Sequence, residues 1–291
     1  MKKLTRIELQ GGLGNQLFIW AMAHHIATLY KVHVEVIVST NKKTRKDRPC
    51  EIFALGEICN HNISIRQSKV FGYFTKTIDK ISKLLPRKSK RIFSGLRIVT
   101  LEKPYDIYTD EPKHPRILRG YFQSLEIPEG TKMDIFTELK SHLDLVSLPG
   151  ILRDRKEDVV AHIRRGDTKN ISEEWGVLSL DYYKNLIPDG MNLTICTDEK
   201  DNTGNIYKRF SAALILGPEE SSPWQVLKII SKSKVFIMAN STLSWWGAWI
   251  AKNDHDSTIY FPDPWRPNNI ELGRSLKWSN VRTSEAIFEE A

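Results

Sequence analysis

The sequence has few cysteines, no apolar run long enough to span a membrane and no apolar core of a secretory signal peptide. Its three cysteines, Cys50, Cys59 and Cys196, are odd in number and lack the spacing of metal ligands, which argues against a disulfide framework and a zinc site. No segment approaches the ~20 apolar residues of a transmembrane helix. The first residues lead into an alternation of Ile7 and Leu9 instead of a continuous apolar stretch. We therefore expect a cytoplasmic protein.

The composition predicts a folded protein that carries an excess of positive charge. Of the 291 residues, 41% are hydrophobic and 27% are charged, which suits two domains or one large one. The 43 basic and 35 acidic residues give a formal charge of +8. Such a charge attracts an anionic partner, whether nucleic acid, a nucleotide or a lipid surface, and by itself does not distinguish among them.

Many of the basic residues lie between residues 66 and 97, among apolar ones. At helical spacing, Phe74, Ile78, Ile81 and Leu85 share a face and the lysines lie opposite. A basic amphipathic helix of this kind can rest on an anionic membrane, and a solvated surface helix has a similar pattern, so both interpretations stay open. The segment lacks the aromatic pattern of RNA-binding motifs, which makes nucleic acid the less favoured partner.

The first half of the chain begins with a β-loop-α-β pattern. We predict a strand over residues 6–10, a tight loop over Gly11-Gly12-Leu13-Gly14, a buried helix over residues 15–30 and a strand over residues 32–38. The signal from residue 40 to about residue 103 is too weak to order. A strand follows near residues 117–124 and a helix over residues 131–145. Proline and glycine near residue 149 then suggest two domains, residues 1–150 and residues 151–291.

The second half alternates between strands and helices, which predicts an α/β fold with a parallel sheet covered on both faces. Ligands of such sheets bind beyond the carboxyl ends of the strands. The strands are expected at residues 159–163, 193–197, 213–216, 235–239 and 258–261, and the helices at residues 181–187, 205–210, 223–231 and 242–251.

Three groups of polar residues follow three of these strands, and each suits a sugar nucleotide. An arginine offers a planar fork of donors to phosphate oxygens, a helix start favours an anion, and an aspartate can accept from the N1 and exocyclic amine of guanine. The groups can also be a surface ion pair and an ordinary helix cap. The groups are Arg164, Arg165 and Asp167; Thr197 and Asp198; and Asn240, Ser241 and Thr242.

Two further patterns are weaker. Gly12 and Gly14, with Glu35 about 20 residues on, suggest a dinucleotide fingerprint, but Leu17 replaces its third glycine. Asn15 and Gln16 at that helix start can contact a sugar or phosphate, or the glycines can simply form a structural turn. Asp254-His255-Asp256 has the acidic-x-acidic form of a metal site, but it lies at the opposite end of the sheet. We interpret it as a solvated loop and expect no essential metal.

Four motifs together resemble the alpha-1,2-fucosyltransferases of glycosyltransferase family 11. The resemblance implies a GT-B architecture, two Rossmann-like domains facing across a cleft. It also implies an inverting, metal-independent transfer of L-fucose from GDP-fucose to the 2-hydroxyl of a terminal galactose, as in O-antigen or other surface polysaccharide synthesis. The motifs are Gly11-Gly12-Leu13-Gly14-Asn15-Gln16-Leu17-Phe18, Gly120-Tyr121-Phe122-Gln123-Ser124, His162-Ile163-Arg164-Arg165-Gly166-Asp167 and Asn240-Ser241-Thr242-Leu243-Ser244-Trp245-Trp246-Gly247-Ala248-Trp249.

The resemblance also implies residue roles. Arg165 would clamp the β-phosphate of the donor, and Arg164, His162 and Asp167 would shape the same pocket. Asp167 is a structural partner of the arginines or the catalytic base, a role open also to Glu173 and Glu174. The remaining donor-binding residues would be Thr197, Asp198, Asn240, Ser241 and Thr242 in the second domain and Gly12, Asn15 and Gln16 in the first. Acceptor-binding residues are not assigned.

Other classes remain open beside this hypothesis. A different GT-B enzyme would use the same pocket for another sugar nucleotide, a non-catalytic module would bind the nucleotide without transfer, and a nucleic-acid-binding protein would account for the charge. For the enzyme we expect a terminal galactoside acceptor, which can be lipid-linked. The segment of residues 66–97 would then bring it to the inner face of the cytoplasmic membrane.

Overall fold

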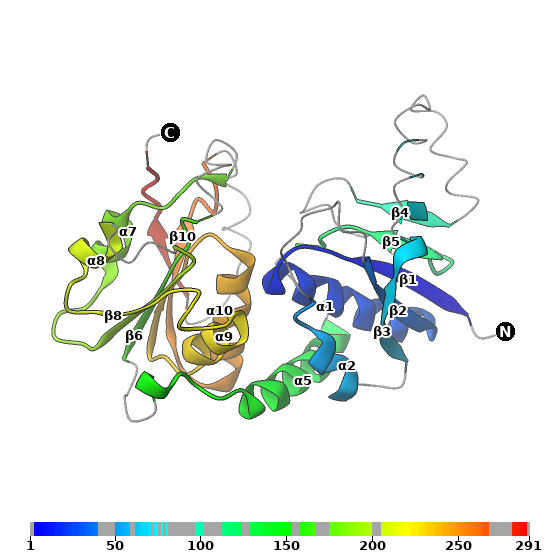
Figure 1. Cartoon of the computed structure of the whole chain (residues 1–291), viewed down its shortest axis with the longest axis horizontal. Coiled ribbons are helices and arrows are strands. Elements are labelled where there is room, and N and C mark those ends of the chain that lie inside the picture. Colours follow the sequence, from blue (N-terminus) through cyan, green and yellow to red (C-terminus); the bar gives the residue numbers. More distant parts are fainter. Residues whose placement is uncertain are drawn as a thin grey trace. The chain divides into compact units, whose positions relative to one another are not determined.

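The chain folds into two compact units, Met1–His142 and Leu143–Ala291, in a computed structural model (Figure 1). Each unit is built on one parallel β-sheet. The model describes residues 3–39, 50–58, 62–71, 73–74, 77, 80, 97–101, 112–123, 129–152, 158–166, 175–199, 205–267 and 281–289.

The N-terminal unit has a five-stranded sheet in the order β3-β2-β1-β5-β4. Every strand pair in it is parallel, with Arg6 of β1 opposite Glu35 on one side and Ile117 on the other. The strands are β1 (Leu4–Leu9), β2 (His33–Ser39), β3 (Ile63–Ser68), β4 (Ile98–Thr100) and β5 (Ile117–Arg119). The helices are α1 (Leu13–Tyr30), α2 (Phe53–Ile58), the 3-10 turn η2 (Glu129–Thr131) and α5 (Lys132–Leu145), which crosses the division between the units.

The core of this unit follows from the hydrophobic pattern. In β1 every second residue is buried, so Thr5, Ile7 and Leu9 face inward. Helix α1 has buried residues on most of its faces, as its nearly continuous apolar sequence predicted. The glycine loop therefore connects two well-packed elements, β1 and α1.

The C-terminal unit has a six-stranded, wholly parallel sheet in the order β11-β10-β9-β6-β7-β8. Read from β8, this is the 3-2-1-4-5-6 order of the doubly wound nucleotide-binding fold. Helices α7 and α8 lie on one side of the sheet and α9 and α10 on the other (Figure 1). The strands are β6 (Val159–Ile163), β7 (Leu193–Thr197), β8 (Leu214–Leu216), β9 (Val235–Ile237), β10 (Thr258–Asp263) and β11 (Val281–Glu285). The helices are η3 (Gly150–Leu152), α7 (Leu180–Leu186), α8 (Asn205–Arg209), α9 (Pro223–Ser231) and α10 (Thr242–Asp254).

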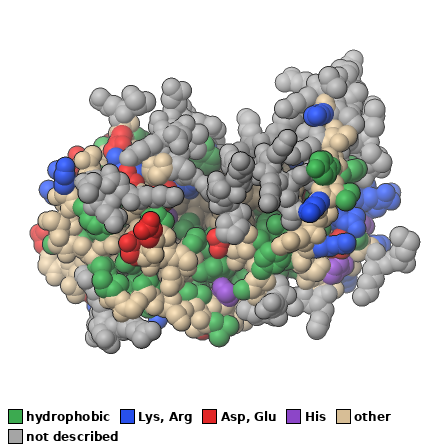
Figure 2. All heavy atoms as spheres, in the orientation of Figure 1, with side chains coloured by type: hydrophobic (Ala, Val, Ile, Leu, Met, Phe, Trp, Pro, Cys, Tyr) green, Lys and Arg blue, Asp and Glu red, His purple; other side chains and the backbone are tan. Residues whose placement is uncertain are grey.

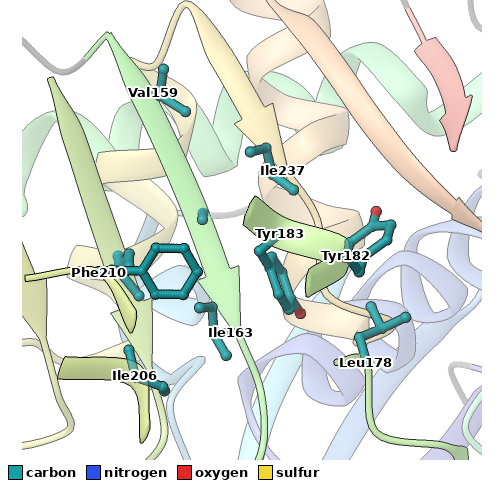
Figure 3. Packing of buried hydrophobic residues seen from close by; sticks show 10 residues of the cluster. Val159, Ile163, Leu178, Tyr182, Tyr183, Ile206, Phe210 and Ile237 are labelled. Atoms are coloured by element: carbon teal, nitrogen blue, oxygen red, sulfur yellow. The ribbon is translucent and has the colours of Figure 1, made fainter. Parts of the chain in front are cut away.

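Strand β6 is the centre of this unit, and all five of its residues are buried. Tyr182 and Tyr183 of α7 share one hydrophobic cluster with residues of β6 and with Phe210, and Figure 3 shows Tyr183 near the Ile163 end of the strand. A strand covered on both faces reads as a continuous apolar run, which explains why the sequence alone located it. The residues that follow Ile163 are therefore held by a rigid strand.

Each sheet has one switch point, where the order of the strands reverses. In the C-terminal unit the chain moves outward from β6 to β7 and β8 and then returns to place β9 on the other side of β6. In the N-terminal unit the equivalent point lies between β1 and β5. Ligands of doubly wound sheets bind beyond the strand ends at such points.

Candidate functional site

Two of the predicted polar groups meet directly at the carboxyl ends of β6 and β7. One carboxylate oxygen of Asp198, Oδ1, accepts the backbone N–H of Arg165 and that of Gly166, both at 2.8 Å. The other oxygen, Oδ2, lies 3.9 Å from Nε of Arg164. Asp198 therefore fixes the turn that carries both arginines, and only Oδ2 is left for a role such as guanine recognition.

Gly166 is required by this close approach. A Cβ atom placed at this position would lie 2.8 Å from the backbone oxygen of Asp198 and 3.1 Å from Oδ2 of its carboxylate. A backbone atom at that distance has to move before any side chain fits. The glycine of the His162–Asp167 motif is therefore explained by packing against the neighbouring strand end.

Arg165 is buried between two carboxylates, whereas Arg164 is more accessible. Nε of Arg165 donates to Glu199 at 3.4 Å, and its Nη1 donates to Glu289. The Arg165 side chain is 6% exposed. The Arg164 side chain is 25% exposed. Among the described residues, Nη2 of Arg165 has no hydrogen-bond partner, so this edge of the guanidinium remains able to bind an anion.

Glu289 reaches Arg165 from a short C-terminal segment, residues 286–289, that we call the C-terminal strap. The strap runs antiparallel to residues 177–179: Ser179 N–H donates to Ile287 O at 2.7 Å and Glu289 N–H donates to Val177 O at 2.8 Å. Its first residue, Ala286, donates to Asp263 O at 3.0 Å. The end of the described chain is thus anchored beside the β6 turn.

His162, the last residue but one of β6, joins this strand to the first turn of α10. Its Nδ1 lies 2.6 Å from Oγ of Ser244, and that hydroxyl also accepts the backbone N–H of Ala239 at 3.1 Å. Burial lowers the pKa of His162 to about 4, and the charge of Asp198 offsets only part of that effect. The imidazole is therefore neutral near pH 7 and acts as a hydrogen-bonding tie between β6 and α10.

The third predicted group forms the start of α10. Oγ of Ser241 accepts the backbone N–H of Ser244 at 3.1 Å, so Ser241 is the N-cap. Nδ2 of Asn240 donates to the carbonyl oxygens of Trp175 and Gly176, at 2.9 and 3.2 Å. Thr242 is the first residue of the helix. These contacts hold the segment that follows the β6 turn over the positive end of α10, where an anion is stabilised.

Arg266 is a further cation at this edge of the sheet. It follows β10, is buried, and its guanidinium lies 3.1 Å from the ring centroid of Trp175. Burial lowers its pKa to about 9, which leaves it charged near pH 7. Because Asn240 holds the backbone of the same tryptophan, Arg266 and Asn240 fix one residue between them.

In the N-terminal unit, the glycine motif and the Gly120–Ser124 motif meet at the switch point. Nε2 of Gln123, just beyond β5, donates to Oδ1 of Asn15 in α1 at 2.8 Å. Gln16 is buried and donates to Gly11 O at 2.9 Å, while its Oε1 accepts the N–H of Glu51. Gln16 thus stabilises the loop, and the Asn15 amide, oriented by Gln123, is the better candidate for contact with a ligand.

Gly12 and Gly11 shape the same loop. Gly12 is the N-cap residue of α1 and makes no side-chain cap, and its carbonyl accepts the N–H groups of Asn15 and Gln16. Gly11 has φ +79°, and a Cβ there would lie 2.4 Å from the side-chain nitrogen of Asn15. The glycines therefore allow the Asn15 side chain to fold back against the loop.

Some predicted residues have local roles or fall outside the described chain. Oγ1 of Thr197 accepts the N–H of Glu199 at 3.2 Å. Glu35 lies within β2, where Arg6 donates to it at 2.9 Å, and not at a strand end as a ribose contact would require. His255, between α10 and β10, bonds the carbonyl oxygen of Ser233, which lies between α9 and β9. Asp167, Glu173 and Glu174, and most of residues 66–97, lie outside the described residues.

Three charged residues of the site were not found from the sequence. Glu199 was adjacent to Asp198 and could have been included with it. Arg266 follows Trp265 and lies five residues beyond the last predicted strand, where a site residue could have been sought. No feature of the sequence pointed to Glu289. It reaches Arg165 because the C-terminal strap pairs with residues 177–179, which are distant in the sequence. No cluster of three metal-binding side chains occurs in the described part of the chain.

Comparisons with known proteins place the chain among bacterial glycosyltransferases by similarity. It is 24% identical to the O-antigen biosynthesis glycosyltransferase WbnK of Escherichia coli, over 94% of this chain and 99% of that protein. It is 29% identical to an alpha-1,2-colitosyltransferase of Escherichia coli, over 88% of this chain and 90% of that protein. No family model matches the sequence.

A solved structure supports the fold. The fucosyltransferase NodZ from Bradyrhizobium aligns with a TM-score of 0.51 at 11% identity, over 92% of this chain and 97% of that one. The two parallel α/β units are those of the GT-B fold, as the sequence motifs predicted. The full-length similarity to two glycosyltransferases supports glycosyltransferase activity and a link to O-antigen synthesis for this chain.

Proposed function

We propose that the protein is an inverting alpha-1,2-fucosyltransferase that transfers L-fucose from GDP-fucose to the 2-hydroxyl of a terminal galactose. The observation that carries this proposal is the junction of the β6 and β7 ends, where Asp198 fixes both arginines of the His162–Asp167 motif. The motif resemblance to glycosyltransferase family 11 and the similarity to an alpha-1,2-colitosyltransferase support the same linkage chemistry.

The site has the groups that such a reaction requires at the leaving group. In an inverting transfer, the acceptor hydroxyl attacks the anomeric carbon while GDP departs from the opposite face. Negative charge develops on the diphosphate, so a guanidinium stabilises the transition state more than the bound donor. The free Nη2 edge of Arg165, the accessible Arg164 and the start of α10 would supply this stabilisation. No metal is needed for this role.

Proton removal from the acceptor is a separate step of the proposal. An oxocarbenium-like transition state requires little base assistance, and Asp167 is first a partner of the arginines and second a base. His162 is unsuited to that role, because its Nδ1 is bound to Ser244 and its side chain is buried. If Asp167→Asn weakened GDP binding but left turnover at saturating donor within about twofold of the parent, the base role would be rejected.

A second candidate donor is GDP-colitose, because the 29% identical relative is a colitosyltransferase. Colitose is fucose without its 3-hydroxyl, so the same diphosphate grip and linkage chemistry serve both sugars. The two donors differ only at that hydroxyl, which a site built to bind it would discriminate strongly.

The deciding experiment is a donor and acceptor screen with the purified full chain. GDP-fucose, GDP-colitose and GDP-mannose are each tested against terminal β-galactosides that differ in the next sugar, and the product linkage is read by NMR. We expect α-1,2-fucosylation of galactose. Arg165→Ala should lower the rate by about 100 to 1,000-fold. Turnover with GDP-colitose and not with GDP-fucose would show that GDP-colitose is the donor. Near-normal turnover by folded Arg165→Ala would reject the proposed donor site.

We also propose that the segment of residues 66–97 brings the enzyme to an anionic lipid surface, where a lipid-linked acceptor would lie. Among the helical residues described there, Val70, Tyr73 and Phe74 lie three and four positions apart and are 77%, 63% and 47% exposed. Lys69 and Lys80 are exposed in the same segment. On the face shown in Figure 2, visible Lys and Arg side chains gather over the N-terminal unit. None of the described helices has the length and apolarity needed for a membrane crossing.

This surface is tested by sedimentation with phosphatidylglycerol and phosphatidylcholine vesicles. Val70→Asp with Tyr73→Asp should weaken binding to phosphatidylglycerol about tenfold, because apolar burial and charge attraction act together. Met133→Asp removes an equally exposed apolar side chain from α5 and serves as the control. Unchanged vesicle binding by the double variant would reject the surface.

A further inference from the structure

The C-terminal strap carries a carboxylate to the arginine on which the proposed donor site depends. We propose that Glu289 is a positioning residue: it holds the Arg165 guanidinium, opposite Glu199, so that its Nη2 edge faces the diphosphate. This inference rests on the proposed function, because it assumes that Arg165 binds the donor. It adds a residue that lies outside the four sequence motifs.

The backbone on both sides of the contact is fixed. Arg165 N–H is bound by Asp198, and Glu289 N–H is bound by Val177 O. The strap packs closely as well: Gly176 has φ +69°, and a Cβ there would lie 2.5 Å from the ring of Phe288. Since Phe288 also packs on the hydrophobic core of the unit, Glu289 extends from an anchored segment and not from a loose tail.

The two carboxylates contact different nitrogens of the guanidinium. Glu199 is bound at Nε and Glu289 at Nη1, so the plane of the group is set from two directions. A guanidinium has five N–H groups, and these bonds use two of them. The remaining donors are presented in a fixed orientation, which lowers the entropy lost when an anion binds.

The opposite possibility is that Glu289 competes with the donor. Arg164 and Arg165 face three carboxylates in the described site, those of Asp198, Glu199 and Glu289, and a diphosphate adds more negative charge. If Glu289 had to leave before the donor bound, its removal would strengthen binding. Positioning and competition therefore predict changes of opposite sign.

The test measures GDP affinity by isothermal titration calorimetry on the full chain. Glu289→Ala should weaken GDP binding about tenfold, a coupling of about 1.4 kcal/mol. Glu289→Gln, whose side-chain oxygen still accepts from Nη1, should stay within about threefold of the parent. Glu285→Gln removes the same charge from β11 at an exposed position without contact to Arg165, and should leave affinity unchanged.

The remaining outcomes separate this inference from the function on which it rests. In an Arg165→Ala background, Glu289→Ala should have no further effect on GDP affinity, since a positioning residue acts only through its partner. Melting temperatures identify any variant that has merely lost the strap. If Glu289→Ala binds GDP as well as or better than the parent while Arg165→Ala does not bind, positioning is rejected and the donor site stands. If Arg165→Ala itself binds GDP normally, the donor site is rejected.

Discussion

The two units place polar side chains at the same topological position but with opposite character. Beyond β6 and β9 the switch point of the C-terminal unit is ionic, with two arginines, three carboxylates and a buried histidine. Beyond β1 and β5 the switch point of the N-terminal unit is built from glycines and uncharged amides. The fold therefore supplies the location, and the residue type decides whether an anion or a neutral, hydroxyl-rich sugar is the suited ligand.

The charged switch point depends most on its glycine. Gly166→Ala would place a Cβ 2.8 Å from the backbone oxygen of Asp198, which forces the turn away from β7 and breaks the two N–H bonds to that carboxylate. We expect GDP affinity to fall about 100-fold, since both arginines move with the turn. Calorimetry measures this, and Gly150→Ala, which meets open space, is the control. Equal affinity in both variants would show that the turn does not position the anion site.

The buried histidine should make the charged site sensitive to acid, unlike the amide site. The folded pKa of His162 is about 4, below its ordinary value of 6.5, so the unfolded state binds the proton first. Stability is then complete above pH 6.5 and is lost as the pH falls from 6.5 toward 4. Between pH 7 and 5 the loss from this residue should be about 2 kcal/mol.

Urea unfolding of the parent and of His162→Gln at pH 7 and pH 5 checks this prediction. The parent should lose more stability on acidification than the variant, by that amount. If the variant loses as much stability as the parent, the acid sensitivity arises from other groups, for instance His114 and His142, whose pKa values burial also lowers. The cluster of Asn15, Gln16 and Gln123 has no group that titrates in this range.

The sequence located these two sites unequally well, for a physical reason. Strands β6 and β7 were predicted with the observed bounds because a strand buried on both faces is a short apolar run between turn residues. β3, β4 and β11 are more exposed and lacked such a pattern. The strap pairs through backbone hydrogen bonds, which leave no periodicity in the sequence, so Glu289 could not be found in advance.

The roles of single residues were harder to predict than their positions. The sequence brought Asp198 to the correct strand end, but its two backbone hydrogen bonds make it first an anchor of the arginine turn. Gln16 was grouped with Asn15, yet it is buried in the loop that it stabilises. Hydrogen-bond partners depend on three-dimensional neighbours, here residues up to 35 positions apart, and a motif does not specify them.

A milder substitution tests the switch point of the N-terminal unit, where Asn15 and Gln123 lie. Asn15→Ala removes the amide that Gln123 orients and leaves the loop contacts of Gln16 in place. If this site binds a neutral sugar, the transfer rate should fall about fivefold while GDP affinity stays within twofold, because a lost hydrogen bond to a neutral group costs about 1 kcal/mol. Gln67→Ala, at an exposed position of β3, is the control. An equal loss of GDP affinity would place the anion, not the sugar, against Asn15.

The smallest expected effect concerns metal. If the arginines and the start of α10 neutralise the leaving diphosphate, EDTA should change the transfer rate by less than twofold, because their charge replaces that of a divalent cation. The assay compares enzyme dialysed against EDTA with the same enzyme after addition of magnesium or manganese. A large loss that either metal restores would mean that the ionic switch point is incomplete without a cation.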